Sequence, residues 1–392
     1  MRTLMFNHPF IKDKESYYLP TLLLFITGSF IFCGYSSINA LFYITIIAFI
    51  IKLTHQKTVD TISTGIIFVI FTLLYFSMTL LWSSYSGDFI KYIRYSLCII
   101  SFIYIISYTY QRNRILLLNC ILIASTLSSL VAIFSINNLS SISIIRLPSP
   151  YGPENVIDFA GYCAIGFIIG LYLTLGSKKI EFIALYSCLS IINLAACLLT
   201  QSRGPILYMT ICSLLLIRKK NIKITLFLFS AIIALVISLS MTNIINLGEL
   251  ASRFLSLNTE LNGSQGYRGA IWEFSLSKII ESPFFGHGIL TPLNYLTPSN
   301  TLFTTTHNVY IGSLFTGGVV GFSFFIIMCA TTLKSGIKIY KDDPLPVVLF
   351  LYALMHISSQ WKFLIMSPDA PWFIFWMPLA FNLYKKQNEN KS

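Results

Sequence analysis

Apolar segments long enough to cross a lipid bilayer recur from one end of this chain to the other. A hydrocarbon core of about 30 Å needs about 20 apolar residues in a helix. Backbone N–H and C=O groups in lipid must form hydrogen bonds with one another because no water is available. No alternating strand pattern is present, so the spans are expected to be helices. The sequence therefore predicts an all-α polytopic membrane protein with about 12 transmembrane helices, at roughly 17–33, 38–54, 61–82, 90–110, 115–137, 157–175, 180–199, 205–217, 223–243, 309–332, 345–363 and 370–384.

The net charge of +12 is explained by how the chain crosses the membrane. With the N-terminus placed in the cytoplasm, the cytoplasmic segments hold 19 of the 27 Lys and Arg residues and seven of the 15 Asp and Glu residues. They therefore carry the whole net charge, as the positive-inside rule predicts. We expect both termini in the cytoplasm and membrane lipids around the helices, and no nucleic-acid partner.

The chain divides into three predicted parts: an N-terminal bundle of about nine helices at 1–243, a long outer loop at 244–308, and about three C-terminal helices at 309–392. Within the loop, GYRGAIWEFSLSKII has apolar residues at helical spacing. Pro283 and Gly286 follow and are expected to end that helix. A loop of this length with structure of its own is usually functional.

Two arginines stand out on the outer side. Arg203 lies in TQSRGP between two apolar segments, where a guanidinium is costly unless an anion compensates it. The plainer alternative is snorkelling to phospholipid headgroups, although the flanking Ser, Gly and Pro favour a tight turn that directs the side chain. Arg268 opens the predicted loop helix, and its plainer alternative is a surface arginine stacked on Trp272.

His307 is the strongest candidate for a chemical group, because a neutral imidazole is the natural general base near neutral pH. The alternative is a polar residue that ends a loop. Asn308 is itself a good helix N-cap, so His307 is not needed for capping. Gly318 and Gly321 follow on the same predicted helix, where small residues allow close helix packing.

Other polar residues are weaker candidates. Arg146, Tyr267, His287 and Asn308 could line an outer cavity, and His356 lies within a span as a packing or relay residue. The chain has no Walker A motif, so ATP-driven transport is not expected. It has no outer acidic pair or His/Asp cluster, so neither a catalytic metal nor another cofactor is expected.

Two outward arginines with a histidine suit one kind of chemistry. Arginine forks bind phosphate oxygens, and preorganised cations stabilise the negative charge that develops on a diphosphate leaving group. A histidine can then deprotonate the attacking hydroxyl. The pattern favours glycosyl transfer from a diphosphate-linked donor whose lipid part lies in the membrane.

The sequence also resembles a known family. His307-Asn308, nine residues, Gly318, two residues and Gly321 are similar to the H-N-x9-G-x-x-G pattern of the O-antigen ligase family. TQSRGP at 200–205 resembles the S-R-G turn of the wider ligase/polymerase superfamily, and 267–289 resembles its loop segment.

The resemblance implies a GT-C-like glycosyltransferase at the periplasmic face of the Gram-negative inner membrane. Such enzymes move O-antigen polysaccharide from an undecaprenyl-diphosphate-linked donor to a lipid A–core acceptor without metal or ATP. Carried over to this chain, Arg203 and Arg268 would bind the diphosphate, and His307 would activate the acceptor hydroxyl.

Three other functions remain open at this stage. An O-antigen polymerase shares the S-R-G turn and the donor, but polymerases of this type tend to have two long outer loops. A protein O-oligosaccharyltransferase would use the same donor with Ser or Thr acceptors. A carrier that flips a lipid-linked sugar would place its polar groups near the bilayer midplane rather than at the outer face.

Overall fold

The computed structural model describes residues 17–55, 63–85, 89–135, 146–217, 267–298, 300–359 and 364–383. The predicted ninth span at 223–243 and the first part of the outer loop at 244–266 lie outside the described residues. Within these residues the protein is all-α apart from one two-stranded antiparallel sheet, in which β1 (Tyr295–Leu296) pairs with β2 (Leu302–Phe303).

The described helices coincide with the predicted spans. They are α1 (Tyr18–Ile31), α2 (Ser36–His55), α3 (Gly65–Met78) continued by η1 (Thr79–Trp82), α4 (Phe89–Arg112), α5 (Arg114–Phe134), α6 (Val156–Gly176), α7 (Ile180–Leu199), α8 (Arg203–Leu214), α11 (Arg268–Glu281), α12 (Val309–Ile339), α13 (Leu345–His356) continued by η4 (Ile357–Ser359), and η5 (Trp372–Trp376) leading into α14 (Met377–Leu383).

Seven of these helices are long and apolar enough to cross a membrane, so the chain is a multi-pass membrane protein. The predicted loop helix is confirmed as α11, which ends at Glu281, just before Pro283. Several boundaries differ from the prediction: α3 begins at Gly65 rather than 61, the described part of α13 with η4 ends at Ser359 rather than 363, and α12 continues to Ile339, seven residues beyond the predicted end at 332. Lys334 and Lys338 lie on its exposed side, while Gly336 packs closely against α14, so this last part of the helix still has a buried face.

Among the seven long apolar helices, α6 is the most enclosed, with 83% of its most apolar stretch buried. Its neighbours approach closely at two glycines. A Cβ on Gly166 would overlap side-chain atoms of Ser125 and Asn193, and a Cβ on Gly170 would overlap Ser190. Small residues of this kind bring membrane helices into contact and let polar side chains bridge them.

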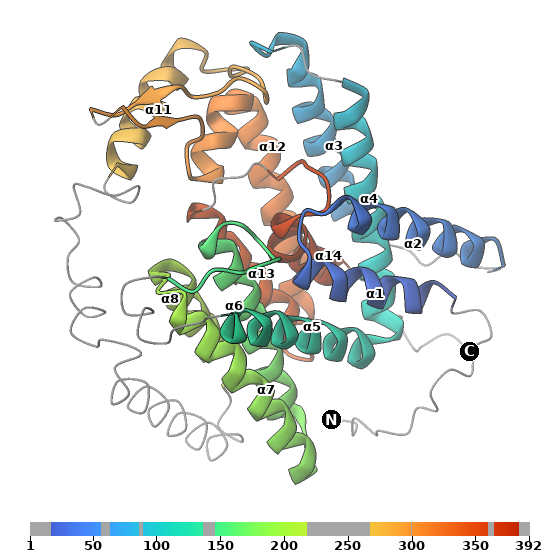
Figure 1. Cartoon of the computed structure of the whole chain (residues 1–392). Helices are drawn as coiled ribbons and strands as arrows, with labels where there is room; N and C mark the ends of the chain where they lie inside the picture. Colours follow the sequence, from blue (N-terminus) through green and yellow to red (C-terminus); the bar gives the residue numbers. More distant parts are fainter. Residues whose placement is uncertain are drawn as a thin grey trace.

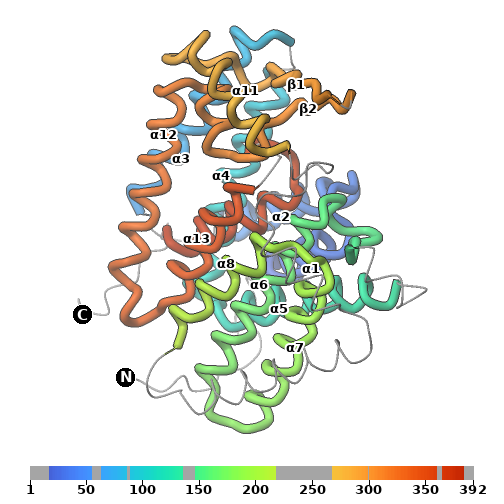
Figure 2. Tube along the Cα trace, turned by 90° about the vertical axis from the view of Figure 1, so that its left-hand side faces the viewer, coloured from blue at the N-terminus to red at the C-terminus, as the bar shows by residue number. Residues whose placement is uncertain are grey.

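Polar contacts join several helix ends. On the side predicted to be cytoplasmic, Arg114 at the start of α5 forms a 2.8 Å ion pair with Asp343, which follows α12. The hydroxyl of Tyr340 donates to the Leu215 carbonyl just after α8. On the other side, α11 and the small sheet lie beside the first turns of α12 (Figures 1 and 2).

Helix α12 is interrupted at Gly318, whose φ of 62° and ψ of −167° lie in a region essentially restricted to glycine. Segment 283–288 fills the break. Its N–H groups donate to carbonyls at 315–316, and its carbonyls accept from N–H groups at 319–320, over 2.8–3.2 Å. Backbone groups left unpaired by the broken helix are thus satisfied by the segment that follows α11.

The glycines of the H-N-x9-G-x-x-G pattern therefore have different surroundings. A Cβ on Gly318 would overlap the backbone of Phe284, and a Cβ on Gly286 would overlap the backbone of α12 at 316–318. Gly321 instead lies against the Tyr75 ring of α3, which is the environment expected of a helix-packing glycine. Gly318 is required both for its backbone conformation and for the close contact between α12 and the backbone of Phe284.

We predict that Gly318→Ala destabilises the protein. The substitution forces an unfavourable backbone conformation, which costs about 1–3 kcal/mol, and it overlaps Phe284. The thermal unfolding midpoint should fall, and limited proteolysis should cut the α11 segment faster. Gly176→Ala is the control, because a Cβ there meets nothing within 4 Å. Equal stability of the two variants would contradict this role.

Candidate active site

His307 has a left-handed backbone with φ of 51°, which few non-glycine residues adopt. The next residue, Asn308, is the N-cap of α12, and its side-chain oxygen accepts from the N–H groups of Tyr310 and Ile311 at 2.9 and 3.3 Å. The prediction that Asn308 caps the helix is confirmed. The backbone therefore turns sharply at His307 and enters the helix one residue later.

Three parts of the chain hold this turn. The indole N–H of Trp272, on α11, donates to the carbonyl of Thr306 at 3.1 Å. The Thr306 hydroxyl donates to the carbonyl of Asn308 at 2.8 Å. The ring of Phe303, on β2, meets the His307 imidazole edge-on, with ring centroids 5.6 Å apart. A strained backbone persists only where its surroundings determine it in this way.

Arg268 lies close to His307 and changes its chemistry. Burial of the imidazole, together with the positive charge of Arg268, lowers the pKa of His307 below its usual 6.5. Burial also lowers the pKa of Arg268, but a guanidinium remains charged at neutral pH. A neutral imidazole therefore stands beside a permanent cation, so one site combines a proton acceptor with a group that binds anions.

Arg203 begins α8 two residues after a second left-handed residue, Gln201, with φ of 52°. Pro205 occupies the first turn of α8, where its missing N–H costs nothing. Tyr208, further along α8, packs on Gly204 and interacts electrostatically with Arg268. The structure thus brings His307 and Arg268 together, and Tyr208 of the helix that starts at Arg203 is near enough to interact electrostatically with Arg268.

Arg146 supports the TQSRGP turn. Its guanidinium donates to the carbonyl of Thr200 at 3.0 Å and to the hydroxyl of Ser202 at 2.7 Å. The neighbouring N–H of Leu147 donates to the carbonyl of Leu199 at 3.1 Å. These bonds hold the chain immediately before Arg203 in place.

His287 and Tyr267, two further candidates for lining a cavity, also contact neighbouring parts of the chain. The Nε2 of His287 is 2.7 Å from the Lys278 carbonyl and therefore donates to it, and the ring stacks on Phe315 at 4.9 Å. The Tyr267 ring contacts Phe303 at 6.1 Å. Phe303 also touches His307, so Tyr267 belongs to the same ring cluster as the candidate base.

The last turn of α13 contacts both helices that begin at the candidate site. The hydroxyl of Tyr310, on the first turn of α12, donates to the carbonyl of Leu354 at 2.8 Å. The hydroxyl of Tyr208, on α8, is 3.2 Å from that of Ser358. One short stretch of chain therefore sets the separation between the beginnings of α8 and α12.

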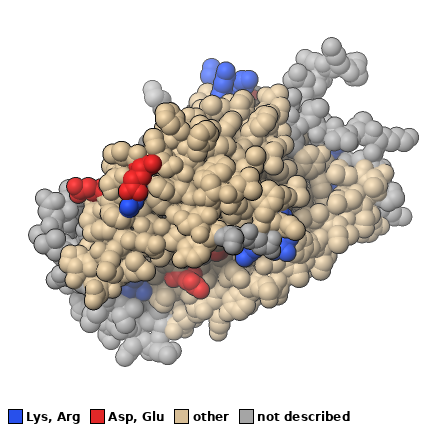
Figure 3. Space-filling view, turned by 90° about the horizontal axis from the view of Figure 1, so that it is seen from above, with Lys and Arg blue, Asp and Glu red and all other residues tan. Residues whose placement is uncertain are grey.

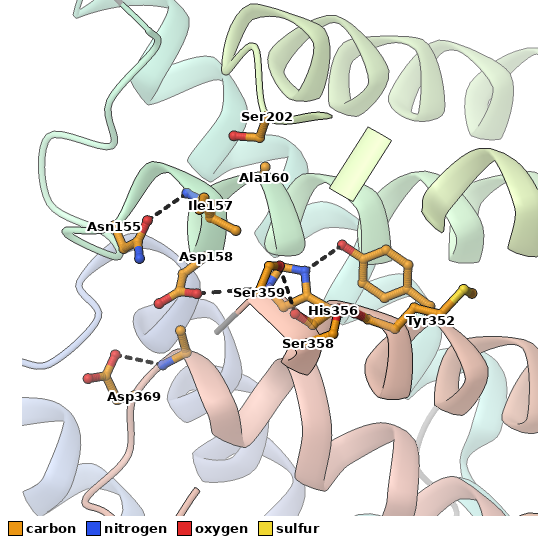
Figure 4. A network of polar contacts seen from close by, with 12 residues as sticks. Asn155, Ile157, Asp158, Ala160, Ser202, Tyr352, His356, Ser358, Ser359 and Asp369 are labelled. Carbon is orange, nitrogen blue, oxygen red and sulfur yellow. Dashed lines mark hydrogen bonds and ion pairs between the residues drawn. The ribbon is translucent and has the colours of Figure 1, made fainter. Parts of the chain in front are cut away.

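A buried pair anchors that stretch to α6 (Figure 4). The Nε2 of His356 is 3.7 Å from a carboxylate oxygen of Asp158, and its Nδ1 is 3.2 Å from the hydroxyl of Tyr352. His356 and Asp158 have no solvent exposure. Gly161 allows the approach, because a Cβ there would crowd the imidazole. Sequence reasoning found His356 but missed Asp158, although an acid in the apolar run NVIDFAGY is itself a signal.

Residues 188–326 match a family model described as O-antigen ligase. The matched segment contains the TQSRGP turn, α11, the candidate base and the break in α12. This segment is therefore similar to the O-antigen ligase family. The chain is also 25% identical, over 246 residues, to an O-antigen ligase of Pseudomonas aeruginosa, an alignment covering 59% of this chain and 57% of the relative. The chain thus spans a little over half of that relative's length.

We predict that Asn308→Ala lowers the rate of whatever reaction this candidate site carries out by more than its effect on stability explains. Loss of the cap costs about 1 kcal/mol of folding free energy and frees the left-handed residue before it. Thermal unfolding and turnover should be measured together. Asn308→Asp keeps an accepting oxygen and is the control. A loss of activity no greater than the loss of folded protein would contradict the prediction.

We also predict that Arg268→Gln raises the pKa of His307. The substitution removes the positive charge that disfavours the imidazolium. Titration of the ring by NMR in lipid nanodiscs measures this without turnover. Lys278→Gln is the control, because Lys278 lies on the same helix but pairs with Glu281. An unchanged or lowered His307 pKa in Arg268→Gln would contradict the electrostatic link.

Proposed function

We propose that this protein is an O-antigen ligase of the bacterial inner membrane. It would transfer O-antigen polysaccharide from undecaprenyl diphosphate to the lipid A–core oligosaccharide at the periplasmic face. The observation that carries the proposal is the neutral imidazole of His307 beside the cation of Arg268, inside the segment that matches the ligase family. The fold would be GT-C-like, with both termini in the cytoplasm.

The proposed reaction is a direct displacement at the anomeric carbon. His307 takes the proton from the acceptor hydroxyl, whose oxygen forms the new bond to the sugar. The bond between the anomeric carbon and the diphosphate oxygen breaks, and undecaprenyl diphosphate leaves with the electron pair. Arg203 and Arg268 hold the diphosphate and stabilise the charge it gains, so the step needs no metal ion.

The lowered pKa of His307 suits this role in two ways. The imidazole is neutral at neutral pH and ready to accept a proton. Once formed, the imidazolium lies beside Arg268 and is destabilised by a like charge, which favours release of the proton to water before the next turnover. The fixed backbone at His307 keeps the base in one position throughout.

Complementation of a ligase-deficient strain tests the proposal. The wild-type chain should restore full-length O-antigen on lipid A–core. The ligation activity of His307→Ala should be at least a hundredfold lower, because a general base usually contributes at least that factor. Arg203→Ala and Arg268→Ala should also lose activity, with weaker donor binding. Lys278→Ala is a control for loss of a loop cation. Full ligation by His307→Ala would overturn the mechanism.

A lipopolysaccharide gel separates ligase from polymerase in the same strains. Loss of a ligase leaves polymer on the carrier lipid, whereas loss of a polymerase leaves core with at most one repeat. A protein O-oligosaccharyltransferase would instead leave lipopolysaccharide unchanged and alter glycoproteins. The family match and the named relative favour ligation.

A further inference from the structure

A second polar site lies on a different part of the bundle, between α2, α4 and the loop before η5. It is a small cavity of about 80 Å³, which has room for more than one water-sized group. Asn39 and Tyr43 reach it from α2, Arg94 and Tyr95 from α4, and Ser367 from the loop. None of these residues belongs to the candidate active site.

Five of the eight lining residues share one chemical property, and Phe42, Cys98 and Pro368 complete the wall. An amide, two phenols, a hydroxyl and a guanidinium can all donate hydrogen bonds, and no carboxylate lines the cavity. The side-chain oxygen of Asn39 is buried without a hydrogen-bond partner, and turning the amide over would present its NH₂ group instead. Several donors around one arginine match the oxygen atoms of a phosphate group.

Arg94 has no carboxylate partner among the residues that the structure describes. Its neighbours include the Tyr95 ring, 5.6 Å from the guanidinium, and Tyr43 and Cys98, with which it interacts electrostatically. An arginine on a membrane-spanning helix is costly unless an anion compensates its charge. Charged side chains are sparse on the face of the molecule seen in Figure 3.

The depth of the cavity indicates where the anion comes from. Arg94 lies five residues after the start of α4, about 7.5 Å along the helix axis. Tyr43 lies seven residues after the start of α2, about 10 Å along its axis. Both helix starts are on the side predicted to be outer. A ligand at this level would be the head of a lipid in the outer leaflet.

The cavity wall continues towards the buried pair of Asp158 and His356. Ser367 and Pro368 run directly into Asp369, whose carboxylate accepts from the Cys33 thiol at 3.0 Å. Figure 4 shows Asp369 beside the network of Asp158 and His356. The loop that closes the cavity therefore continues into the region that anchors the end of α13.

We propose that this cavity binds a phosphate group on the lipid A part of the acceptor. The inference rests on the proposed function, because that function requires a phosphorylated lipid to approach from the outer leaflet. Binding there would hold the acceptor lipid against the bundle while its core oligosaccharide extends towards His307.

Lipid binding by the full-length protein in phosphatidylcholine nanodiscs tests the site. Diphosphorylated lipid A should bind the wild type and the His307→Ala variant equally, and Arg94→Gln about tenfold more weakly. Enzymatically dephosphorylated lipid A should bind the wild type and Arg94→Gln alike. Lys91→Gln is the matched control, because Lys91 is an outer cation on α4 that does not line the cavity. Unchanged lipid A binding in Arg94→Gln would overturn the site.

Competition identifies the source of the phosphate. Phosphatidylglycerol and inorganic phosphate should displace lipid A poorly. If either one competes as well as unlabelled lipid A, the cavity is not an acceptor site and the inference fails. In steady-state ligation, Arg94→Gln should raise KM for the lipid A–core acceptor about tenfold and leave kcat and the donor KM unchanged.

The two proposals can fail separately. If the protein binds lipid A in an Arg94-dependent way but transfers no sugar, the ligase function is wrong and the lipid site stands. If the protein ligates normally and Arg94→Gln has no effect on lipid A binding or acceptor KM, the ligase function stands and the lipid site is wrong.

Discussion

The active-site geometry depends on the break in α12 at Gly318. The break leaves backbone groups that segment 283–288 and the Tyr75 hydroxyl satisfy, and the hydrogen bonds to 283–288 fasten the end of α11 to a membrane helix. Once α11 is fastened, Trp272 can hold the carbonyl of Thr306 and Arg268 can stand beside His307. A backbone irregularity about 10 residues from the candidate base, deep enough to need internal partners, therefore places the two groups that the proposed chemistry uses.

The two pairs of polar side chains described above differ in their roles. Arg268 and His307 form the candidate reactive pair, while Asp158 and His356 lie fully buried and join α6 to α13. Removing one member of such a buried pair leaves the other uncompensated, which is strongly destabilising. The buried pair thus supports the last turn of α13, against which Tyr310 from α12 and Tyr208 from α8 are hydrogen bonded.

Much of the fold could be predicted because it follows local rules. The length of the apolar segments predicted the membrane spans. Asn308 is a residue type that caps helices, and it predicted the start of α12, while Pro283 predicted the end of α11. The conformation of Gly318 could not be predicted in this way, because it depends on a segment 30 residues earlier in the chain. The same is true of Arg146, whose partners lie in the TQSRGP turn. The roles of Arg203, Arg268 and His307 in catalysis remain predictions.

The most direct test of the central claim is ligation by purified protein from a defined undecaprenyl-diphosphate-linked donor and a lipid A–core acceptor, with and without EDTA. The wild type should form the glycosidic product at the same rate in both conditions. His307→Ala should bind the donor normally and form product at least a hundredfold more slowly. Near-normal product formation by His307→Ala, or loss of wild-type activity in EDTA, would contradict a metal-independent reaction with His307 as the base.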